Sequence, residues 1–471
     1  MNSFVQTVGR VESLDLTRVL RLHIFDYHNR FFSFDPESVS LVELEPEDAE
    51  SLKAFKELCG RDFSRADSNP KDILPCELLD RLIKKGLFSP QSMRRDDKDQ
   101  IPGPRVEIMV NATQECNLAC QYCFVDRGKF GYGDDRERML SPQLAERLIA
   151  ILPKAIPWAK EFCIHFYGGE PLLNLPAIQA SVEAAAESDC RFVFAITTNG
   201  TVYDENVLSV LRKGKFTVIL SIDGPSAVHD ELRKTQSGEA THAKVIDFLN
   251  MIRADPALTV RGSSVVRHNW PLKDAYSYLK TLPIDLIKAQ AIRVQESHPL
   301  SLTRKERSVY MEHLSDIAWE IIQGLERGEA PKDDRFSNRV LQILIGMTRT
   351  SFCGAGSSIY GVACDGTVYP CVLLAGHAGM ALGKIDDGSM DWVENGRIWA
   401  NRPANDRCIN CWALPLCGGG CPAMVSVCGE DECEISRASC ELALAIYGFI
   451  SDKIDLLTLA GFPGELHDQK T

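Results

Sequence analysis

The 471-residue chain has no long apolar run, no surplus of basic residues and no recognisable secretion signal. No stretch approaches the roughly 18 consecutive apolar residues that a membrane-spanning helix needs, so we expect no membrane span. Lys and Arg number 52 against 65 Asp and Glu. The net charge of −13 argues against a nucleic-acid partner, because binding phosphates requires the opposite surplus. The first 25 residues are interrupted by charges and lack a small-residue cleavage site, which predicts a cytoplasmic protein.

Cysteine, by contrast, is abundant, with 17 in the chain. Disulfide-rich scaffolds are short and secreted, whereas this chain is long and lacks a signal, so we expect the thiols mainly to hold metal. Three cysteines lie together at 116–123, and ten fall between Cys353 and Cys440. Four scattered cysteines are predicted to be small core residues: Cys59, Cys76, Cys163 and Cys190.

The middle of the chain alternates β-rich apolar runs with helical periods. The predicted strands are 106–110, 162–167, 192–197, 216–222, 259–266 and 287–294. The predicted helices between them are 142–152, 175–187, 205–213, 243–253 and 273–282. Six such repeats predict an α/β fold with a parallel sheet and right-handed crossovers. In these folds the chemistry lies at the carboxyl ends of the strands.

The flanking regions differ from this pattern. Residues 1–100 predict short strands at 18–23 and 30–33 around a turn at 27–29, with helices at 49–58 and 78–85. This mixture suggests a small winged-helix-like module, followed by a linker at 93–104. Helices at 302–327 and 336–348 are expected to bridge to a cysteine-rich region that has little periodicity. We expect metal rather than packing to hold that region together. The predicted units are 1–100, 101–300, 301–350, 351–445 and a C-terminal helix and tail at 446–471.

The triplet Cys116, Cys120 and Cys123 is the most informative motif. A four-iron cube normally takes four cysteines, so three leave one iron open to a small molecule. A structural zinc site normally has four ligands, and no further His or Cys lies within thirty residues of the triplet on either side. Core cysteines or half a zinc site remain the plain alternatives.

The spacing C-x-x-x-C-x-x-C, followed by Phe124, resembles the signature of radical S-adenosylmethionine (radical SAM) enzymes. The resemblance implies a partial (β/α)6 barrel and a 4Fe-4S cluster whose open iron is chelated by SAM. It also implies that an electron from the cluster cleaves SAM to a 5′-deoxyadenosyl radical, which abstracts a hydrogen atom.

Three further motifs end predicted strands. Alone, Gly168-Gly-Glu-Pro171 is only a turn, and Thr197-Thr-Asn-Gly200 and Ser221-Ile-Asp-Gly224 are ordinary helix caps. Their positions after the triplet resemble the SAM-binding motifs of the family, with Glu170 near the amino group and Arg233 near the carboxylate. Asp223 is expected to be structural. The implied SAM contacts are Tyr122, Gly168, Gly169, Glu170, Thr198, Asn199, Ser221 and Arg233.

The C-terminal cysteines allow two zinc sites on spacing alone. The segment resembles the SPASM domain of peptide-modifying radical SAM enzymes, which implies two auxiliary iron–sulfur clusters and three clusters in all. The implied ligands of one cluster are Cys408, Cys411, Cys417 and Cys440, and those of the other are Cys353, Cys371 and Cys421.

The chain also departs from the family pattern. Ile359 stands where some relatives have a fourth cysteine, so either Cys364 or a substrate thiolate is expected to complete the second cluster. Cys428 and Cys433 remain unassigned. Val372 stands where the sulfatase-maturing relatives have a catalytic Asp, which puts that activity in doubt.

The resemblance covers about 106–442. The runs Phe130-Gly-Tyr-Gly and Phe166 to Asn174 look like those of thioether-forming peptide maturases, and the N-terminal module is similar to their leader-peptide recognition domain. The implied partners are a cysteine-rich peptide or small subunit, cross-linked from Cys to an Asp or Glu carbon, and a flavodoxin- or ferredoxin-type electron donor. Two alternatives stay open: another radical modification, such as epimerisation or carbon–carbon cross-linking, and a non-catalytic metal-binding adaptor. The catalytic base is not predicted.

Overall fold

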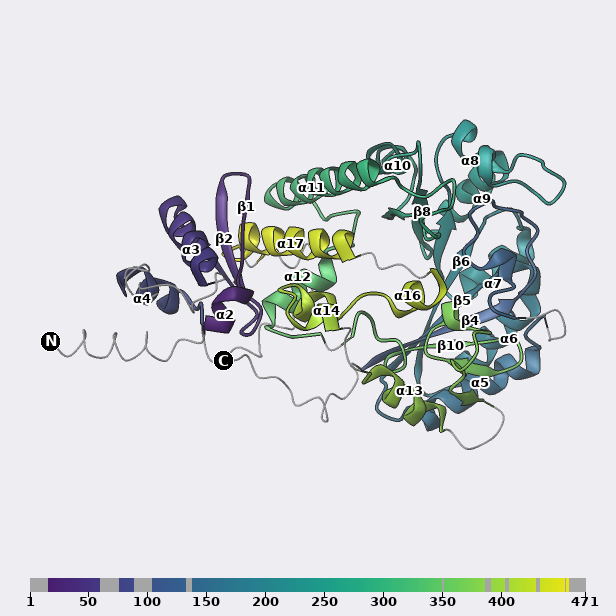
Figure 1. Ribbon diagram of the computed structural model, residues 1–471. Coiled ribbons are helices and arrows are strands. Elements are labelled where there is room, and N and C mark those ends of the chain that lie inside the picture. The colour runs from purple at the N-terminus through teal and green to yellow at the C-terminus, as the bar shows by residue number, and fades with distance from the viewer. Residues whose placement is uncertain are drawn as a thin grey trace.

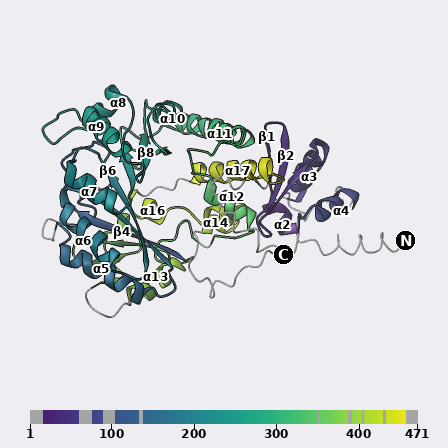
Figure 2. The same cartoon turned by 180° about the vertical axis from the view of Figure 1, so that it is seen from behind.

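Two β-sheets organise the chain in the computed structural model (Figure 1), which describes residues 16–59, 76–88, 104–132, 138–349, 351–385, 391–402, 406–428, 433–453 and 455–456. Within these residues, a three-stranded sheet has the order β1-β2-β3, and a nine-stranded sheet has the order β12-β11-β10-β4-β5-β6-β7-β8-β9. The two sheets lie at opposite ends of the molecule with helices between them (Figures 1 and 2).

Six strands of the larger sheet run parallel in chain order, as the alternating pattern predicts. They are β4 (Arg105–Thr113), β5 (Glu161–Gly168), β6 (Arg191–Thr198), β7 (Thr217–Ser221), β8 (Thr259–Val266) and β9 (Leu286–Ala291). The helices between them are α5 (Pro142–Ala155), α6 (Leu175–Ala186), α7 (Glu205–Lys213), α8 (Ser226–Leu232), α9 (His242–Arg253) and α10 (Leu272–Lys280). Every predicted strand and helix of this region is present within a few residues, and α8 is an additional short helix.

Local chemistry explains these helices, as α5 illustrates. Ser141 caps it by accepting the backbone N–H of Leu144 at 3.2 Å, and Pro142 begins it. Leu148 and Leu152 recur on one face and are almost fully buried against the sheet.

The C-terminal region extends the same sheet. Strand β10 (Ile359–Val362) pairs parallel with β4, and β11 (Thr367–Tyr369) and β12 (Gly383–Lys384) follow antiparallel. Asp365 and Gly366 form the hairpin turn between β10 and β11, where Gly366 adopts φ +79°, and Cys371 follows β11.

A helical layer joins the barrel to the N-terminal sheet. It comprises α11 (Arg304–Glu326), α12 (Ser337–Leu344), α14 (Asp406–Ile409), α15 (Leu414–Cys417), α16 (Pro422–Cys428) and α17 (Cys433–Ile450). Helix α13 (Trp392–Ala400) instead packs on the β10–β12 end of the larger sheet, where the rings of Trp392 and Tyr360 lie 5.1 Å apart (Figure 1). Helix α17 packs against α11 and α12 and buries a long apolar stripe from Leu442 to Ile450. The expectation that metal rather than packing holds this region is wrong for its last helix, which belongs to the main core. The boundary expected at 446 falls inside this helix.

The N-terminal module contains α2 (Leu16–Arg21), β1 (His23–Tyr27), β2 (Arg30–Asp35), β3 (Ser40–Leu44), α3 (Pro46–Cys59) and α4 (Cys76–Lys84). The strand predicted at 18–23 is wrong. Val19 and Leu22 are fully buried, and their spacing of three suits a short helix followed by a tight turn. The predicted turn is present, with φ +45° at His28 and +62° at Asn29, and β3 was missed. Except for Pro104, the predicted linker at 93–104 lies outside the described residues.

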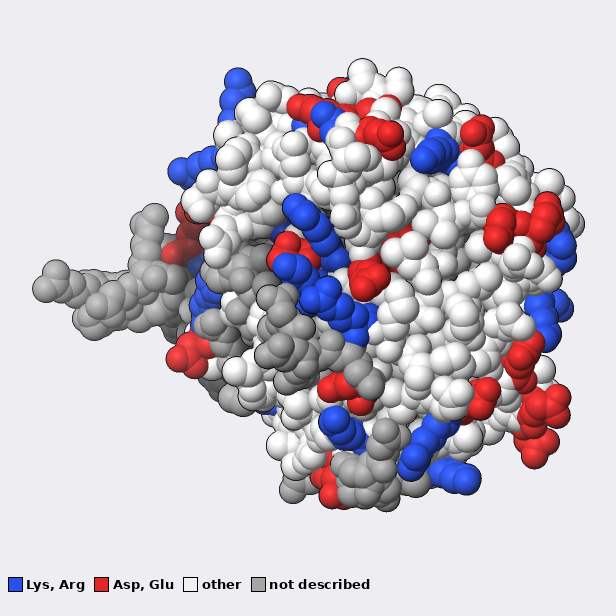
Figure 3. Space-filling view, turned by 90° about the vertical axis from the view of Figure 1, so that its right-hand side faces the viewer, with Lys and Arg blue, Asp and Glu red and all other residues white. Residues whose placement is uncertain are grey.

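The module docks on the helical layer through aromatic side chains. The His23 ring stacks on Trp412 at 3.5 Å between centroids, and the Tyr27 hydroxyl donates to the Ser315 carbonyl at 2.6 Å. On the face drawn in Figure 3, acidic and basic side chains are interspersed, without one continuous basic surface. In the described parts of the chain, no helix combines the length and apolar character needed to cross a bilayer.

Candidate active site

The cysteine triplet lies in the loop that follows β4, at the carboxyl edge of the parallel strands. All three thiols are free and partly buried. The backbone N–H of Leu118 donates to Cys116 Sγ at 3.4 Å, and that of Arg127 donates to Cys123 Sγ at 3.1 Å. Such donors stabilise sulfur that carries negative charge. Burial, together with the charges of Glu170, Cys120 and Cys123, raises the pKa of Cys116 to about 12, so a bound metal would be needed to keep it ionised.

These thiols fit an iron–sulfur cube better than one ion. Among the described side chains, no three His, Cys, Asp or Glu residues lie close enough to hold a single metal ion. Zinc–sulfur bonds of about 2.3 Å would draw thiolates to within about 4 Å of each other. A four-iron cube binds each cysteine at a different iron and accepts wider spacing.

Two glycines let the turn after β5 touch the cysteine loop. A Cβ at Gly169 would lie 2.1 Å from the Glu115 carbonyl oxygen, and one at Gly168 would lie 2.3 Å from the Thr113 carbonyl oxygen. Gly168 also adopts φ +136°, where other residues are strained. The glycines are therefore required for packing whether or not a ligand binds there.

Glu170 is fully buried next to these glycines. Its carboxylate accepts the Thr198 hydroxyl at 2.7 Å and the backbone N–H groups of Asn199 at 2.7 Å and Leu172 at 3.2 Å. Burial raises the Glu170 pKa to about 7 despite these bonds. A carboxylate has about four acceptor positions, so roughly one remains for an ammonium group.

Asn199 connects the end of β6 to the cysteine loop. Its Nδ2 donates to Asn117 Oδ1 at 2.9 Å and lies 4.0 Å from Cys116 Sγ. Ser221 ends β7, is partly buried and pairs in register with Ser263 of β8. The structure therefore brings Thr198, Asn199 and Ser221 to the same edge as the triplet.

The Asp223 carboxylate accepts hydrogen bonds from two of the residues that are predicted to contact SAM. The Tyr122 hydroxyl donates to Asp223 Oδ2, and Arg233 Nε donates to the same oxygen at 3.2 Å. The Arg233 guanidinium lies 5.6 Å from the centre of the Tyr122 ring, and its Nη1 lies 4.0 Å from Cys120 Sγ. The side chains of Arg233 and Asp223 are only 11% and 2% exposed. Asp223 is structural, as expected, and it positions Arg233 beside the triplet.

The C-terminal cysteines influence one another in two groups. Burial, with a smaller contribution from the thiols of Cys353 and Cys421, raises the pKa of Cys371 to about 12. Burial likewise raises the pKa of Cys440 to about 12, and the thiol of Cys417 contributes to that rise. Cys411 donates its N–H to the Cys408 carbonyl at 2.9 Å. Cluster binding by these residues stays a prediction.

Other cysteines lie apart from these groups. The Cys364 thiol is fully buried and donates to the Asn111 carbonyl at 3.2 Å, and no neighbouring cysteine perturbs its pKa. Cys163 is buried and Cys190 partly buried. The side chains of Cys59, Cys76 and Cys428 lie outside the described residues, and Cys433 is partly buried. Cys364 therefore faces β4 rather than the group around Cys371.

Tyr167 and Arg293 are two further residues outside the predicted site. Tyr167 lies near the end of β5, and burial raises its pKa, while the charge of Arg293 lowers it and those of Cys123 and Cys371 raise it. Sequence reasoning missed both residues. Tyr167 immediately precedes the Gly-Gly-Glu-Pro turn, which was the available signal, whereas Arg293 had none.

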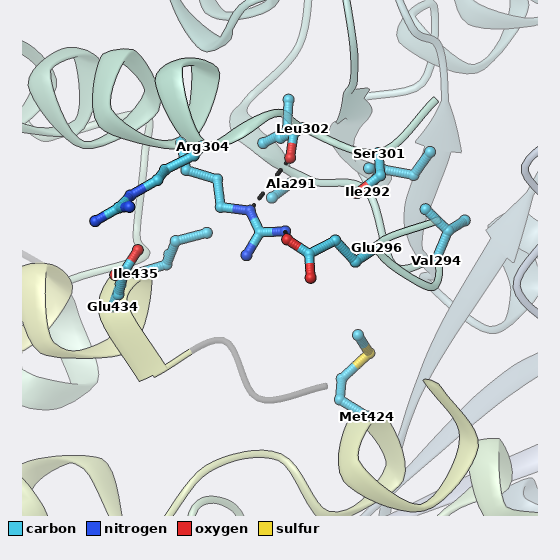
Figure 4. Close-up of a pocket in the computed structure, with 11 residues that line it drawn as sticks. Ala291, Ile292, Val294, Glu296, Ser301, Leu302, Arg304, Met424, Glu434 and Ile435 are labelled. Carbon is cyan, nitrogen blue, oxygen red and sulfur yellow. Dashed lines mark hydrogen bonds and ion pairs between the residues drawn. The ribbon is translucent and has the colours of Figure 1, made fainter. Parts of the chain in front are cut away.

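Two clefts open near this site. One, of about 450 Å³, has Cys116, Arg127 and Lys129 in its wall. The other, of about 310 Å³, lies between the end of β9 and the first turns of α11 and α17 (Figure 4). In the second cleft Arg307 pairs with Glu296 at 3.2 Å.

Residues 110–255 match the family model described as the Radical SAM superfamily. The cysteine-type anaerobic sulfatase-maturating enzyme of Clostridium novyi (strain NT) is 26% identical over 334 residues, 66% of this chain and 86% of the relative. The radical SAM cyclopropyl synthase TigE of Paramaledivibacter caminithermalis is 24% identical over 411 residues, 81% of this chain and 83% of the relative.

Solved structures share the fold. Native anSMEcpe with bound AdoMet aligns with a TM-score of 0.59 and 21% identity, covering 76% of this chain and 100% of that chain. Streptococcus suis SuiB bound to precursor peptide SuiA aligns with a TM-score of 0.50 and 17% identity, covering 87% of this chain and 99% of that chain.

Proposed function

We propose that the chain is a radical SAM enzyme that modifies a peptide or small protein. The observation that carries this proposal is the meeting of the cysteine triplet, Glu170 and Arg233 at one edge of the parallel sheet, where Arg233 Nη1 lies 4.0 Å from Cys120 Sγ. Similarity to sulfatase-maturating enzymes, to TigE and to SuiB supports a peptide or protein substrate.

The residues that would hold the cofactors are those already described. Cys116, Cys120 and Cys123 would bind the barrel cluster, Glu170 would accept the amino group of SAM, and Arg233 would donate to its carboxylate. When bound, the cluster and SAM supply hydrogen-atom abstraction. Tyr122, Gly168, Gly169, Thr198, Asn199 and Ser221 would complete the SAM site.

The finer proposal is thioether formation, joining a substrate cysteine sulfur to a carbon. The carbon loses a hydrogen atom, the thiol loses a proton, and one electron is left over, so an electron acceptor is required. The groups Cys353, Cys371, Cys421 and Cys408, Cys411, Cys417, Cys440 are proposed to hold acceptor clusters. The chain length and the N-terminal run favour a substrate like that of the quinohemoprotein amine dehydrogenase maturation protein, a cysteine-rich small subunit.

The side chain after Cys371 weighs against sulfatase maturation. Val372 is fully buried at the start of a short 3-10 turn and cannot exchange a proton. The carboxylate that the family uses as a base is therefore missing at this position.

The N-terminal module is proposed to recruit the peptide. Strands β1 and β3 are the edges of its three-stranded sheet, and an extended peptide can add to such an edge. The proposed electron donor is of the flavodoxin or ferredoxin type. The cleft of about 450 Å³ beside Cys116 is where it would approach the barrel cluster, and Arg127 and Lys129 suit an acidic partner.

Anaerobic reconstitution and mass spectrometry test this proposal. We expect iron, SAM-dependent release of deoxyadenosine, and a loss of two hydrogens per cross-link in a co-expressed cysteine peptide. Alkylating the peptide cysteines beforehand should block the loss. Zinc without deoxyadenosine would support the adaptor instead, and an unchanged or alkylation-independent mass would reject thioether formation.

A further inference from the structure

The two groups of C-terminal cysteines lie on segments that touch each other. The first group is Cys353, Cys371 and Cys421, and the second is Cys408, Cys411, Cys417 and Cys440. Gly418, directly after Cys417, adopts φ +72°, and a Cβ there would lie 2.1 Å from the Ser351 carbonyl oxygen. The Ser351 hydroxyl in turn donates to the Cys353 carbonyl at 2.7 Å. The chain around Cys353 and the chain around Cys417 are therefore in direct contact.

Arg349 is bonded to both of these segments. Its backbone N–H donates to the Pro415 carbonyl at 2.7 Å, and its Nη1 donates to the Phe352 carbonyl at 2.6 Å. Pro415 lies two residues before Cys417. Phe352 directly precedes Cys353. Arg349 is therefore anchored where a ligand-bearing segment of the first group meets one of the second.

The positive charge of Arg349 has no carboxylate partner within the part of the chain that the structure describes. Its side chain is partly buried and is bonded to neutral oxygens, since Nε donates to Gln342 Oε1 at 2.8 Å and Nη1 to the Phe352 carbonyl. Burial lowers the Arg349 pKa, and the thiols of both groups oppose that change. A partly buried cation is costly until a negative charge compensates it. The thiolates of the two groups, with the clusters they would bind, supply that charge.

Two buried donors near these segments also lack an acceptor. Gln342 is 2% exposed and its Oε1 is occupied by Arg349, so the other amide atom is the NH2 group, which meets no acceptor on any described residue. One turn earlier on α12, Arg339 Nε is likewise buried without a described partner. Helix α12 packs against α15 and α17, which bear Cys417 and Cys440. Buried donors of this kind need an acceptor, and the sulfur atoms of a cluster at these cysteines would provide one.

We infer that Arg349 is a positioning residue for the redox step, which raises the reduction potential of the clusters that the two groups hold, so that they accept the electron left over when the thioether forms. This inference rests on the proposed function, because it takes both groups to hold iron–sulfur clusters. The substrate carbon loses a hydrogen atom to the deoxyadenosyl radical, the thiol loses a proton to solvent, and formation of the C–S bond releases one electron. Accepting that electron adds one negative charge beside Arg349, and a fixed cation stabilises the reduced state.

Redox titration of the reconstituted full-length chain tests this inference without a peptide substrate. In a background with Cys116→Ala, Cys120→Ala and Cys123→Ala, only the C-terminal cysteines are left to bind clusters. Reduction by dithionite in the presence of redox mediators is followed by electron paramagnetic resonance. We expect Arg349→Gln to lower the equilibrium constant for reduction about tenfold, which is about 59 mV for one electron, at unchanged iron content. Arg349→Lys retains the charge and should restore more than half of this shift.

Two more variants complete the experiment. The control Arg437→Gln removes an exposed arginine three residues before Cys440 on α17, and it should leave the potential unchanged because water and salt screen that charge. Gln342→Leu removes the unpartnered amide and should lower the potential in the same direction as Arg349→Gln. An unchanged potential in Arg349→Gln, or an equal shift in Arg437→Gln, would overturn the inference. If Arg349→Gln does not retain iron, an unchanged potential in Gln342→Leu would overturn it instead.

Failure of this inference differs from failure of the proposed function. If a cysteine peptide is cross-linked but the potential does not depend on Arg349, the inference fails and the proposed function stands. If no peptide is modified while Arg349→Gln shifts the potential of the bound clusters, the proposed function fails and the redox role of Arg349 stands. Zinc in place of iron at the C-terminal cysteines would overturn both.

Discussion

Replacing Asp223 by Asn should destabilise the barrel mouth more than any surface substitution. Asp223 accepts from Tyr122 and Arg233, and both side chains of the Arg233–Asp223 pair are nearly inaccessible. Removing one partner of such a pair leaves an uncompensated buried charge and costs about 3–5 kcal/mol. The surface pair Arg212–Asp255 provides the contrast, because breaking it with Asp255→Asn should destabilise the protein far less.

The assay is urea unfolding followed by tryptophan fluorescence. Trp270 reports on this region, since its indole N–H donates to the Asp223 carbonyl at 2.7 Å. A double-mutant cycle with Arg233→Met isolates the pair: removing both charges should cost less than the sum of the single changes. If Asp223→Asn is no more harmful than Asp255→Asn, or if the cycle is additive, the ion pair does not stabilise the site and the reasoning is wrong.

Three further outcomes follow from the geometry. Gly169→Ala should abolish iron binding by the triplet, because the added methyl group would collide with the Glu115 carbonyl. In the control Gly238→Ala the added methyl group meets nothing within 4 Å, so this variant should retain iron. A normal iron content in Gly169→Ala would contradict the prediction. Burial lowers the His229 pKa to about 4, so as the pH falls below about 6.5 the unfolded chain binds a proton at this residue before the folded protein does. The free energy of unfolding should therefore drop by about 3 kcal/mol between pH 6.5 and 4. In His229→Gln this pH-dependent drop should be absent. Cys421→Ser should lower the iron content measured after reconstitution, and Cys163→Ser, at a buried site in β5, should not; equal iron in both would remove Cys421 from the ligand set.

The parallel sheet could be predicted because its signal is local and repeated. Each strand from β4 to β9 is an apolar run followed by a helical period, and the motifs end those strands, so their meeting at one edge follows from topology. The short N-terminal elements were less predictable. The run Arg18–His23 suits a strand by alternation, and only tertiary burial of Val19 and Leu22 selects the helix.

The connections between distant segments could not be predicted from the chain. No local sequence pattern around Asp223 indicates that its carboxylate accepts hydrogen bonds from both Tyr122 and Arg233. Arg293 lies in no motif. The pairing of β10 with β4 joins residues about 250 positions apart, which no local pattern encodes.

That pairing also sets the order in which the molecule can be assembled. Until residues 359–362 leave the ribosome, the outer edge of β4 has unpaired backbone groups, directly before the loop that bears Cys116. Contacts of such long sequence separation form late, so the nascent barrel passes through an aggregation-prone interval with its first cysteines accessible. A holding chaperone that covers this interval should therefore raise the yield of soluble protein, and slower translation over it should lower the yield.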